Sequence, residues 1–588
     1  MGKASIGLRA AALAAAAAMV LAACGGGGDD AEGDGGSGGG SGGEPVKGGT
    51  LTFLTLADQI QHLDPQRNYT GEDLAFTGAY LNRALTVYKQ SPDDKTANEI
   101  VGDLATDTGT PNEDATSWSF TLRDGVKFED GSPVTCEDVK YGVSRVFATD
   151  VIVDGPQYPV AYLDVPKDKD GASVYKGPYI TKGNDTAAFD KAVVCEGNEI
   201  TFNLANPVPD FNFTTTLLSF SPVPKAADTG EKYDQKPVSS GPYKIQENTV
   251  GNQLVLVRNE NWDPESDPTR PAYPDKIVMK FGVDSSVIDQ RIIRDSGEDQ
   301  QAVSRDAIQP ANLAAVFNDD RLKDRRVDVF DAYSYYLAVN VNKVPNLKHR
   351  QALQAALDRA QIIQVDGGKF AGEISDGVIK PNLPADYAES GLWTDLLGQE
   401  IPDSGDPKYA KQLIEESGEP MPEIQYDYGI TPTREKEAAV VVSSLERAGI
   451  KVKPNGIEVG QYYSIVFDPE KAGELMWSGW GPDWPNASTI IPELFTPAGG
   501  FNLSQVDDKE FSAKVQEAKE NVDRAAQSEQ WKELNKEAMA NAWAIPVRDG
   551  RSQGIAGSKV KSASGENGNV YFWSPFTSWP YADMYVEQ

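Results

Sequence analysis

The chain has 588 residues, of which 88 are acidic and 55 are basic, so its formal net charge at pH 7 is −33. A surface this acidic repels nucleic acid and anionic lipid headgroups, which excludes both as electrostatic partners. Its only histidines are His62 and His349, and no metal-binding, P-loop or nucleophile-elbow motif occurs. We therefore expect no metal, no cofactor and no enzymatic activity.

The first 23 residues predict an export signal. Lys3 and Arg9 precede the apolar run 10–23, which is too short and too rich in alanine to span a membrane. The run ends in Leu21-Ala22-Ala23-Cys24, which resembles the bacterial lipobox. The resemblance implies that residues 1–23 are removed and that Cys24 becomes the acylated first residue. The alternative is an ordinary signal peptide with a chance cysteine.

Residues 24–49 predict a flexible tether. They consist almost entirely of Gly, Ser, Asp and Glu, which offer no apolar surface to bury. Such a tether would hold a folded domain at the outer face of the cytoplasmic membrane. The globular part begins near Thr50, and its more than 500 residues exceed what one hydrophobic core normally supports, so two or more lobes are expected.

Strands and helices alternate along the folded part. Alternating apolar and polar residues predict strands at 50–56, 117–122, 199–204, 276–281, 335–340, 451–457 and 474–477. Helical spacing and capping residues predict helices at 73–85, 135–147, 347–360 and 433–448. This alternation favours α/β lobes.

Two cysteines remain in the folded part, Cys136 and Cys195. Free thiols are seldom kept in an oxidising compartment, so an even pair in an exported chain favours a disulfide. A bridge closing a loop of this length would stabilise the fold by about 4 kcal/mol. The alternative is two separate thiols.

Six segments, in this order, carry a family resemblance. They are SWSFTLRDGVKF at 117–128 with DGSPVT at 130–135, SGPYK at 240–244, NENW at 259–262, YLAVN at 336–340, RQAL and ALDR at 350–359, and GWGPDW at 479–484. Together they resemble the extracellular solute-binding proteins (family 5) that include the oligopeptide- and dipeptide-binding proteins of bacterial ABC importers. The resemblance extends from about Gly48 to the C-terminus.

The resemblance implies an α/β clamshell of two lobes, like a periplasmic binding protein, with an extra subdomain on the first lobe. On this sequence, lobe I would comprise residues 50–86, 221–284 and 545–588, and its subdomain residues 87–220. Lobe II would comprise residues 285–544. The polar, turn-rich stretch 150–191 departs from the family pattern and is expected to be a surface insertion.

The resemblance also implies a function. A monomeric lipoprotein would capture a short peptide between its lobes and deliver it to the permease subunits of an ABC importer. The alternatives are the same fold binding a metal chelate, a sugar or an opine, and a peptide-sensing lipoprotein used in signalling. A secreted hydrolase would need a nucleophile and a base that the sequence does not offer.

The resemblance places the ligand site around Asp483, which matches the family's aspartate that receives the ammonium group of the ligand. The alternative is a turn aspartate that caps its own backbone. The flanking Trp480 and Trp484 would wall the cleft, unless they only pack in the core. Further candidates for the cleft, each of which could equally be a structural residue, are Tyr335, Asn340 and Trp393.

Overall fold

The computed structural model describes residues 44–169, 171–458 and 461–588. The expected signal peptide, Cys24 and most of the expected tether lie outside these described residues. No helix among the described residues is both long and apolar enough to span a membrane. Two large sheets, each with its own hydrophobic core, confirm the expected two-lobed α/β fold.

The core of lobe I is a five-stranded sheet of order β11-β1-β10-β9-β8. Its strands are β1 (Thr50–Leu54), β8 (Tyr243–Thr249), β9 (Gln253–Arg258), β10 (Lys276–Lys280) and β11 (Ala302–Ser304). Helix α1 (Gly71–Tyr80) packs against it through edge-to-face aromatic contacts, for example Phe53 with Phe76 at 5.8 Å between ring centroids. The C-terminal strands β18 (Val560–Ser562) and β19 (Met584–Val586) add Val560 and Met584 to the same core.

A second, smaller sheet lies within the segment 87–220 proposed as the subdomain. Its order is β4-β5-β7-β6, from β4 (Thr110–Pro111), β5 (Ser117–Thr121), β6 (Val193–Glu196) and β7 (Glu199–Asn203). Helix α3 (Cys136–Val146) begins at a capping box between Thr135 and Asp138. A disulfide joins Cys136 to Cys195 in β6. Short elements complete this region: β2 (Thr86–Tyr88), α2 (Asp94–Ala97), β3 (Ile100–Gly102), α4 (Tyr158–Tyr162), α5 (Thr186–Ala192) and α6 (Phe211–Thr214).

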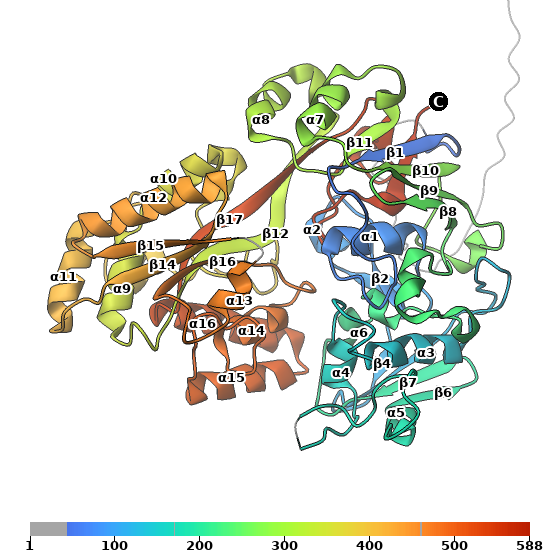
Figure 1. The fold of residues 1–588 in the computed structure, drawn as a ribbon, viewed down its shortest axis with the longest axis horizontal. Coiled ribbons are helices and arrows are strands. Elements are labelled where there is room, and N and C mark those ends of the chain that lie inside the picture. The colour runs from blue at the N-terminus through green and yellow to red at the C-terminus, as the bar shows by residue number, and fades with distance from the viewer. Residues whose placement is uncertain (1–43, 170, 459–460) are drawn as a thin grey trace, which may run out of the picture. The chain divides into compact units, whose positions relative to one another are not determined.

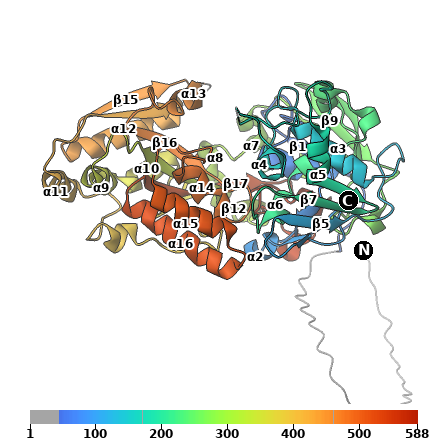
Figure 2. The same cartoon turned by 90° about the horizontal axis from the view of Figure 1, so that it is seen from below.

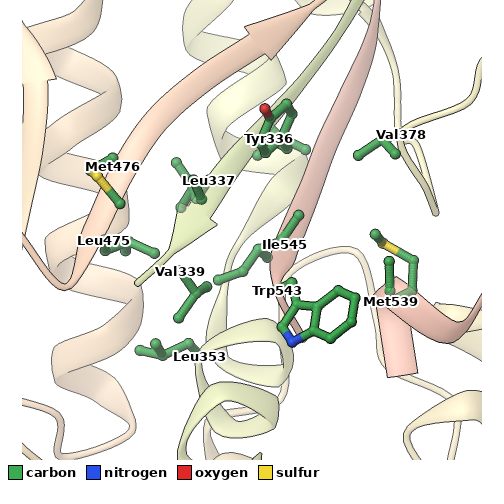
Figure 3. Close-up of a cluster of buried hydrophobic side chains, with 14 of the residues drawn as sticks. Tyr336, Leu337, Val339, Leu353, Val378, Leu475, Met476, Met539, Trp543 and Ile545 are labelled. Atoms are coloured by element: carbon green, nitrogen blue, oxygen red, sulfur yellow. The ribbon is translucent and has the colours of Figure 1, made fainter. Parts of the chain in front are cut away.

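Lobe II is built on a six-stranded sheet of order β13-β17-β12-β16-β14-β15. The strands are β12 (Arg326–Val339), β13 (Gly372–Glu373), β14 (Ile424–Gly429), β15 (Val452–Ile457), β16 (Leu475–Trp480) and β17 (Ala544–Ile555). The helices are α9 (Leu347–Ala356), α10 (Arg359–Asp366), α11 (Pro407–Ser417), α12 (Pro432–Arg447), α13 (Tyr462–Val466), α14 (Ile491–Phe495), α15 (Lys509–Glu520) and α16 (Arg524–Ala540). Figure 2 shows α15 and α16 side by side, and Figure 3 shows Leu337, Leu475 and Trp543 within the core.

The two lobes share the long antiparallel pair β12–β17, which Figure 1 shows running together. Near Leu337 and Ile545 this pair belongs to the lobe II core, whereas Val327 and Ala556 belong to the lobe I core. The proposed return of the chain to lobe I at 545 falls at the start of β17, but the strand still belongs to the lobe II core there, and the chain reaches the lobe I core only near Ala556.

The sheet pairing shifts the other proposed boundary, at 284/285. Strand β11 pairs with β1 in the lobe I sheet, and α7 (Ser285–Arg294) and α8 (Pro310–Phe317) pack around Leu54 and Ile555. In the structure, lobe I therefore extends to about residue 325. A three-residue strand has too little alternation to be recognised in the sequence, and its parallel partner is far away in the chain.

One predicted helix is divided in the structure. Instead of a single helix at 347–360, α9 ends at Ala356 and α10 starts at Arg359. Leu357 has extended backbone angles, and the Asp358 carboxylate accepts a hydrogen bond from the Gln361 N–H as an N-cap. Asp358 therefore starts a new helix rather than continuing the old one.

A buried ion cluster joins lobe I to the segment 87–220. Arg83 and Asp103 have fully buried side chains, with 2.8 Å between Arg83 Nε and Asp103 Oδ1. Arg270 donates to Asp103 Oδ2 at 2.7 Å and pairs with Asp267 at 3.2 Å. These arginines hold the pKa of Asp267 down at about 2 against the opposing effect of burial.

We expect Asp103→Ala to lower the free energy of unfolding by about 3–5 kcal/mol, because it leaves two arginines buried with one carboxylate fewer. Chemical denaturation with a folded-state check by circular dichroism measures this. The matched control is Glu99→Ala, which removes the exposed partner of Lys89 and should change stability little. Equal stability of both variants would contradict the assigned role of the cluster.

Candidate functional site

A cavity of about 370 Å³ lies between the two lobes. Lobe I contributes Tyr69 to Glu72 and a C-terminal loop at 575–577, while β12 contributes residues from Asp331 to Tyr335. The loop after β16 contributes Gly481, Pro482 and Asp483. Strand β16 fixes the start of this loop, because Trp480 pairs with Ser334 of β12.

The Asp483 carboxylate is held by two tyrosine hydroxyls from lobe I. Tyr69 Oη donates to Oδ1 at 2.8 Å, and Tyr158 Oη donates to Oδ2. Burial raises the pKa of Asp483 to about 6, and the two hydroxyls oppose this rise. No basic side chain forms an ion pair with Asp483 among the described residues. The carboxylate is thus hydrogen-bonded but has no positive charge beside it.

Trp484 and Ser488 dock the Asp483 loop onto lobe I. Trp484 Nε1 donates to Asp210 Oδ2 at 2.8 Å, and Ser488 Oγ donates to the same oxygen at 2.6 Å. The Trp484 ring lies 4.9 Å from that of Tyr158 and belongs to the lobe I core. Trp484 therefore packs between the lobes and does not line the cavity, although it positions its neighbour Asp483.

Trp480 supports the loop from the lobe II side. Its indole N–H donates to the Thr489 carbonyl at 2.7 Å, and its ring packs on Phe501 at 4.8 Å. The Asp483 N–H donates to Thr489 Oγ1 at 3.2 Å. Trp480 and Thr489 together fix the turn that presents the Asp483 carboxylate.

Tyr335 lines the cavity beside Tyr333. Their rings stack at 6.2 Å between centroids, and half of the Tyr333 side chain is exposed. The guanidinium of Arg548 lies 3.9 Å from the centroid of the Tyr335 ring. Of the expected site residues, Asp483 and Tyr335 therefore share one cavity.

Asn340 and Trp393 lie elsewhere, in the interior of lobe II. Asn340 directly follows β12, about 20 Å along the chain from Ser334, and its Oδ1 accepts a hydrogen bond from the Asn342 N–H at 3.1 Å. The Trp393 indole N–H donates to the Ser375 carbonyl at 2.7 Å, and its ring holds the Arg359 guanidinium at 3.5 Å. Neither residue lines the cavity around Asp483.

Sequence reasoning missed Tyr69, Tyr158 and Asp210. Tyr158 lies in the stretch 150–191, which was expected to be a surface insertion. In the structure this stretch is partly internal, because Leu163, Val165 and Tyr175 are buried. The tyrosine-rich sequence of α4 was the available signal, but nothing local indicates that it faces Asp483.

A second cavity of about 440 Å³ adjoins the first and shares Asp331, Tyr335 and Ser552 with it. Arg434 and Arg548 line this second cavity. No group of three or more His, Cys, Asp or Glu residues that could hold a metal ion occurs in the part of the chain that the structure describes.

Several solute-binding proteins resemble this chain over most of its length. The periplasmic oligopeptide-binding protein OppA of Salmonella typhimurium is 25% identical over 462 residues, which is 74% of this chain and 77% of the relative. The dipeptide-binding protein DppE of Bacillus subtilis is 23% identical over 441 residues, which is 70% of this chain and 72% of the relative.

Solved structures agree with the fold. The clavulanic acid biosynthesis oligopeptide binding protein 2 superimposes with a TM-score of 0.82 at 28% identity, covering 93% of this chain and 97% of that protein. The unliganded open form of the murein tripeptide-binding protein MppA superimposes with a TM-score of 0.69 at 18% identity. The match covers 93% of this chain and 99% of that protein.

The family model of bacterial extracellular solute-binding proteins, family 5, matches residues 99–502. This range includes both the tyrosines of α4 and the loop that carries Asp483. The members of this family bind solutes for ABC transporters and are not enzymes. The chain belongs to the bacterial extracellular solute-binding proteins of family 5.

Proposed function

We propose that this protein captures short peptides between its lobes and delivers them to an ABC permease in the membrane. The observation that carries the proposal is the Asp483 carboxylate, which lies in an interlobe cavity with two neutral hydroxyl donors and no cation. An ammonium group arriving there would form a charge-assisted hydrogen bond in a site with little water. The peptide-binding relatives OppA and DppE support this choice of ligand.

The same contact would couple binding to lobe closure. Asp483 belongs to lobe II, whereas Tyr69 and Tyr158 belong to lobe I. A ligand ammonium at Asp483 would touch groups of both lobes, so it would favour the conformation that holds them together. A permease could then distinguish loaded from empty protein by shape. We expect the protein to act as a monomer.

The proposal includes a lipid anchor at Cys24, supported by the lipobox resemblance and the glycine-rich segment that follows it. Two acyl chains would hold the protein at the outer face of the cytoplasmic membrane. The segment up to Gly49 would leave the folded lobes free to reach the permease.

Cys24→Ser should release the protein from the membrane fraction into the medium, because the acylated thiol is lost. Fractionation with intact-mass measurement tests this, and Ser37→Ala in the same segment is the matched control. A Cys24→Ser protein that stays in the membrane with unchanged mass would rule out this anchor.

Asp483→Ala should weaken peptide binding by about 30-fold to several thousand-fold, because the ligand ammonium loses its partner in a buried site. N-acetylation of the peptide should weaken binding to the wild type by a similar factor, and the two changes should not add. Calorimetry on the four combinations measures this, with the exposed Asp507→Ala as control. Equal affinity of acetylated and free peptides for the wild type would refute the ammonium contact.

Peptide affinity should also fall as the pH drops below about 6. The carboxyl of Asp483, with a pKa of about 6, must be ionised to hold an ammonium, so each further pH unit should cost up to about tenfold in affinity. The same titration with an N-acetylated peptide should be flat. An affinity for the free peptide that stays constant between pH 5 and 7 would argue against an ionised Asp483 in the complex.

A further inference from the structure

The pairing of β12 with β17 is interrupted between the cores of the two lobes. At this break β12 has three residues, 331–333, where β17 has only Gly550. We call these three residues the bulge, and they also line the cavity around Asp483. Backbone groups in a bulge lack their usual partners on the neighbouring strand. The paired residues on either side of the break are Phe330 with Arg551 and Ser334 with Asp549.

The ammonium group of Lys380 provides hydrogen bonds to the backbone at this break. Its Nζ donates to the Asp331 carbonyl at 2.5 Å, the Tyr333 carbonyl at 2.9 Å and the Gly550 carbonyl at 3.2 Å. The same nitrogen lies 3.0 Å from Asp331 Oδ1. Because an ammonium group has three N–H donors, the bulge and the opposite strand use all of them.

Lys380 reaches the bulge from lobe II, and its side chain is only 3% exposed. Val378, two residues earlier, belongs to the lobe II core, as Figure 3 shows. The Asp331 carboxylate lies against Gly550, where any Cβ would overlap its oxygens, so the glycine leaves the room that the ion pair needs. A buried ammonium group is costly unless oxygen atoms surround it. The bulge and Asp331 supply these oxygens.

The bulge packs against the loop that presents Asp483. A Cβ placed on Gly481 would lie 3.1 Å from the Ala332 carbonyl oxygen and 3.4 Å from the Ala332 Cβ, so the two segments meet without a side chain of residue 481 between them. Gly481 precedes Asp483 by two positions in the same loop. A shift of the bulge would therefore move this loop, and the Asp483 carboxylate with it.

We propose that Lys380 is a positioning residue for the ligand: by holding the bulge, it fixes the loop that places the Asp483 carboxylate. Lys380 does not itself line the cavity around Asp483, so it acts through the contact between Ala332 and Gly481. The inference rests on the proposed function, because it takes Asp483 as the group that receives the ammonium group of a peptide. It predicts that binding of this group depends on a lysine outside the cavity.

A competition experiment tests this role. Purified protein is mixed with a defined set of tripeptides to pentapeptides, each made with a free and with an acetylated N-terminus, and native mass spectrometry gives the bound ratio of the two forms. The wild type should prefer the free form by about 30-fold or more. Lys380→Met should lower this ratio by about tenfold, because a displaced Asp483 carboxylate loses a hydrogen bond to the ammonium group.

The matched control is Lys343→Met. Lys343 is also a lysine of lobe II that donates to a backbone carbonyl, that of Ala472, but this carbonyl lies outside the bulge, so the ratio should stay at the wild-type value. Gly481→Ala perturbs the same contact from the other side, because its methyl group would press on the Ala332 carbonyl, and it should lower the ratio as well. Since both peptide forms compete for the same folded molecules, a loss of stability alone does not change the ratio.

Hydrogen exchange tests the bulge without any peptide. In Lys380→Met, the backbone amides of 331–333 and 549–551 should exchange at least several-fold faster than in the wild type, because the ammonium group no longer holds these segments together. The same amides should exchange at the wild-type rate in Lys343→Met.

The outcomes separate this inference from the proposed function. A wild-type preference that Lys380→Met retains in full, or that Lys343→Met loses equally, would overturn the positioning role and leave the proposed function standing. Unchanged exchange in Lys380→Met would overturn it too. If Lys380→Met does not fold, Gly481→Ala decides, and an unchanged ratio in that variant refutes the contact through which Lys380 acts. Failure of every peptide to bind the wild type, or a wild-type ratio near one, would overturn the ammonium contact of the proposed function together with the role of Lys380.

Discussion

The antiparallel pairing of β12 with β17 is the constraint on which the rest of the cleft depends. The two strands are long enough to reach from the core of one lobe to the core of the other. Each lobe therefore contains one end of the same pair of strands. Register along the ladder places Ser334 opposite Trp480, and this pairing fixes where the loop to Asp483 begins. Register also places Tyr335 opposite Arg548, so the same pair of strands positions two residues that line the second cavity.

The Asp483 carboxylate differs from the two arginines of the second cavity in the charge of its partners. It receives two neutral hydroxyl groups, whereas the guanidiniums of Arg434 and Arg548 rest on aromatic rings and also pair with Glu437 and Asp366. A lysine beside Asp483 would have satisfied the carboxylate permanently and lowered its pKa. Tyrosines satisfy the hydrogen bonds without supplying a charge, so the electrostatic attraction for an incoming cation is preserved.

Local patterns and the family resemblance were enough to predict the α/β class, part of the strands in each large sheet and the loop that presents Asp483, but not β8, β9 or β14. They worked because alternation, capping residues and the GWGPDW segment are each contained in a few consecutive residues. Local patterns failed for residues whose role depends on a partner that lies far away in the chain. Tyr158 and Asp483 are 325 positions apart in the chain, and no periodicity relates them.

The same limitation explains the two candidates that lie in the core. Asn340 is a candidate because it ends the YLAVN segment, and Trp393 because it lies in a loop where the family often forms a side-chain pocket, but neither place in the sequence tells which way the side chain points. Trp393 instead packs against Arg359, and burial lowers the pKa of this arginine to about 10 although Asp403 lies 3.8 Å from its Nη2. A tryptophan can be needed simply to pack against a buried guanidinium. No sequence pattern distinguishes such a tryptophan from one that binds a ligand.

The disulfide has a consequence for how this protein would survive outside the cell. Cys136 and Cys195 are 59 positions apart, and Tyr158, which reaches Asp483, lies inside the loop that they close. The exposed turns near Lys167 and Lys182 are the kind of site that extracellular proteases cut first. Because the bridge encloses these turns, a single cut there would leave both fragments covalently joined, and α4 could keep its place against the lobe II loop.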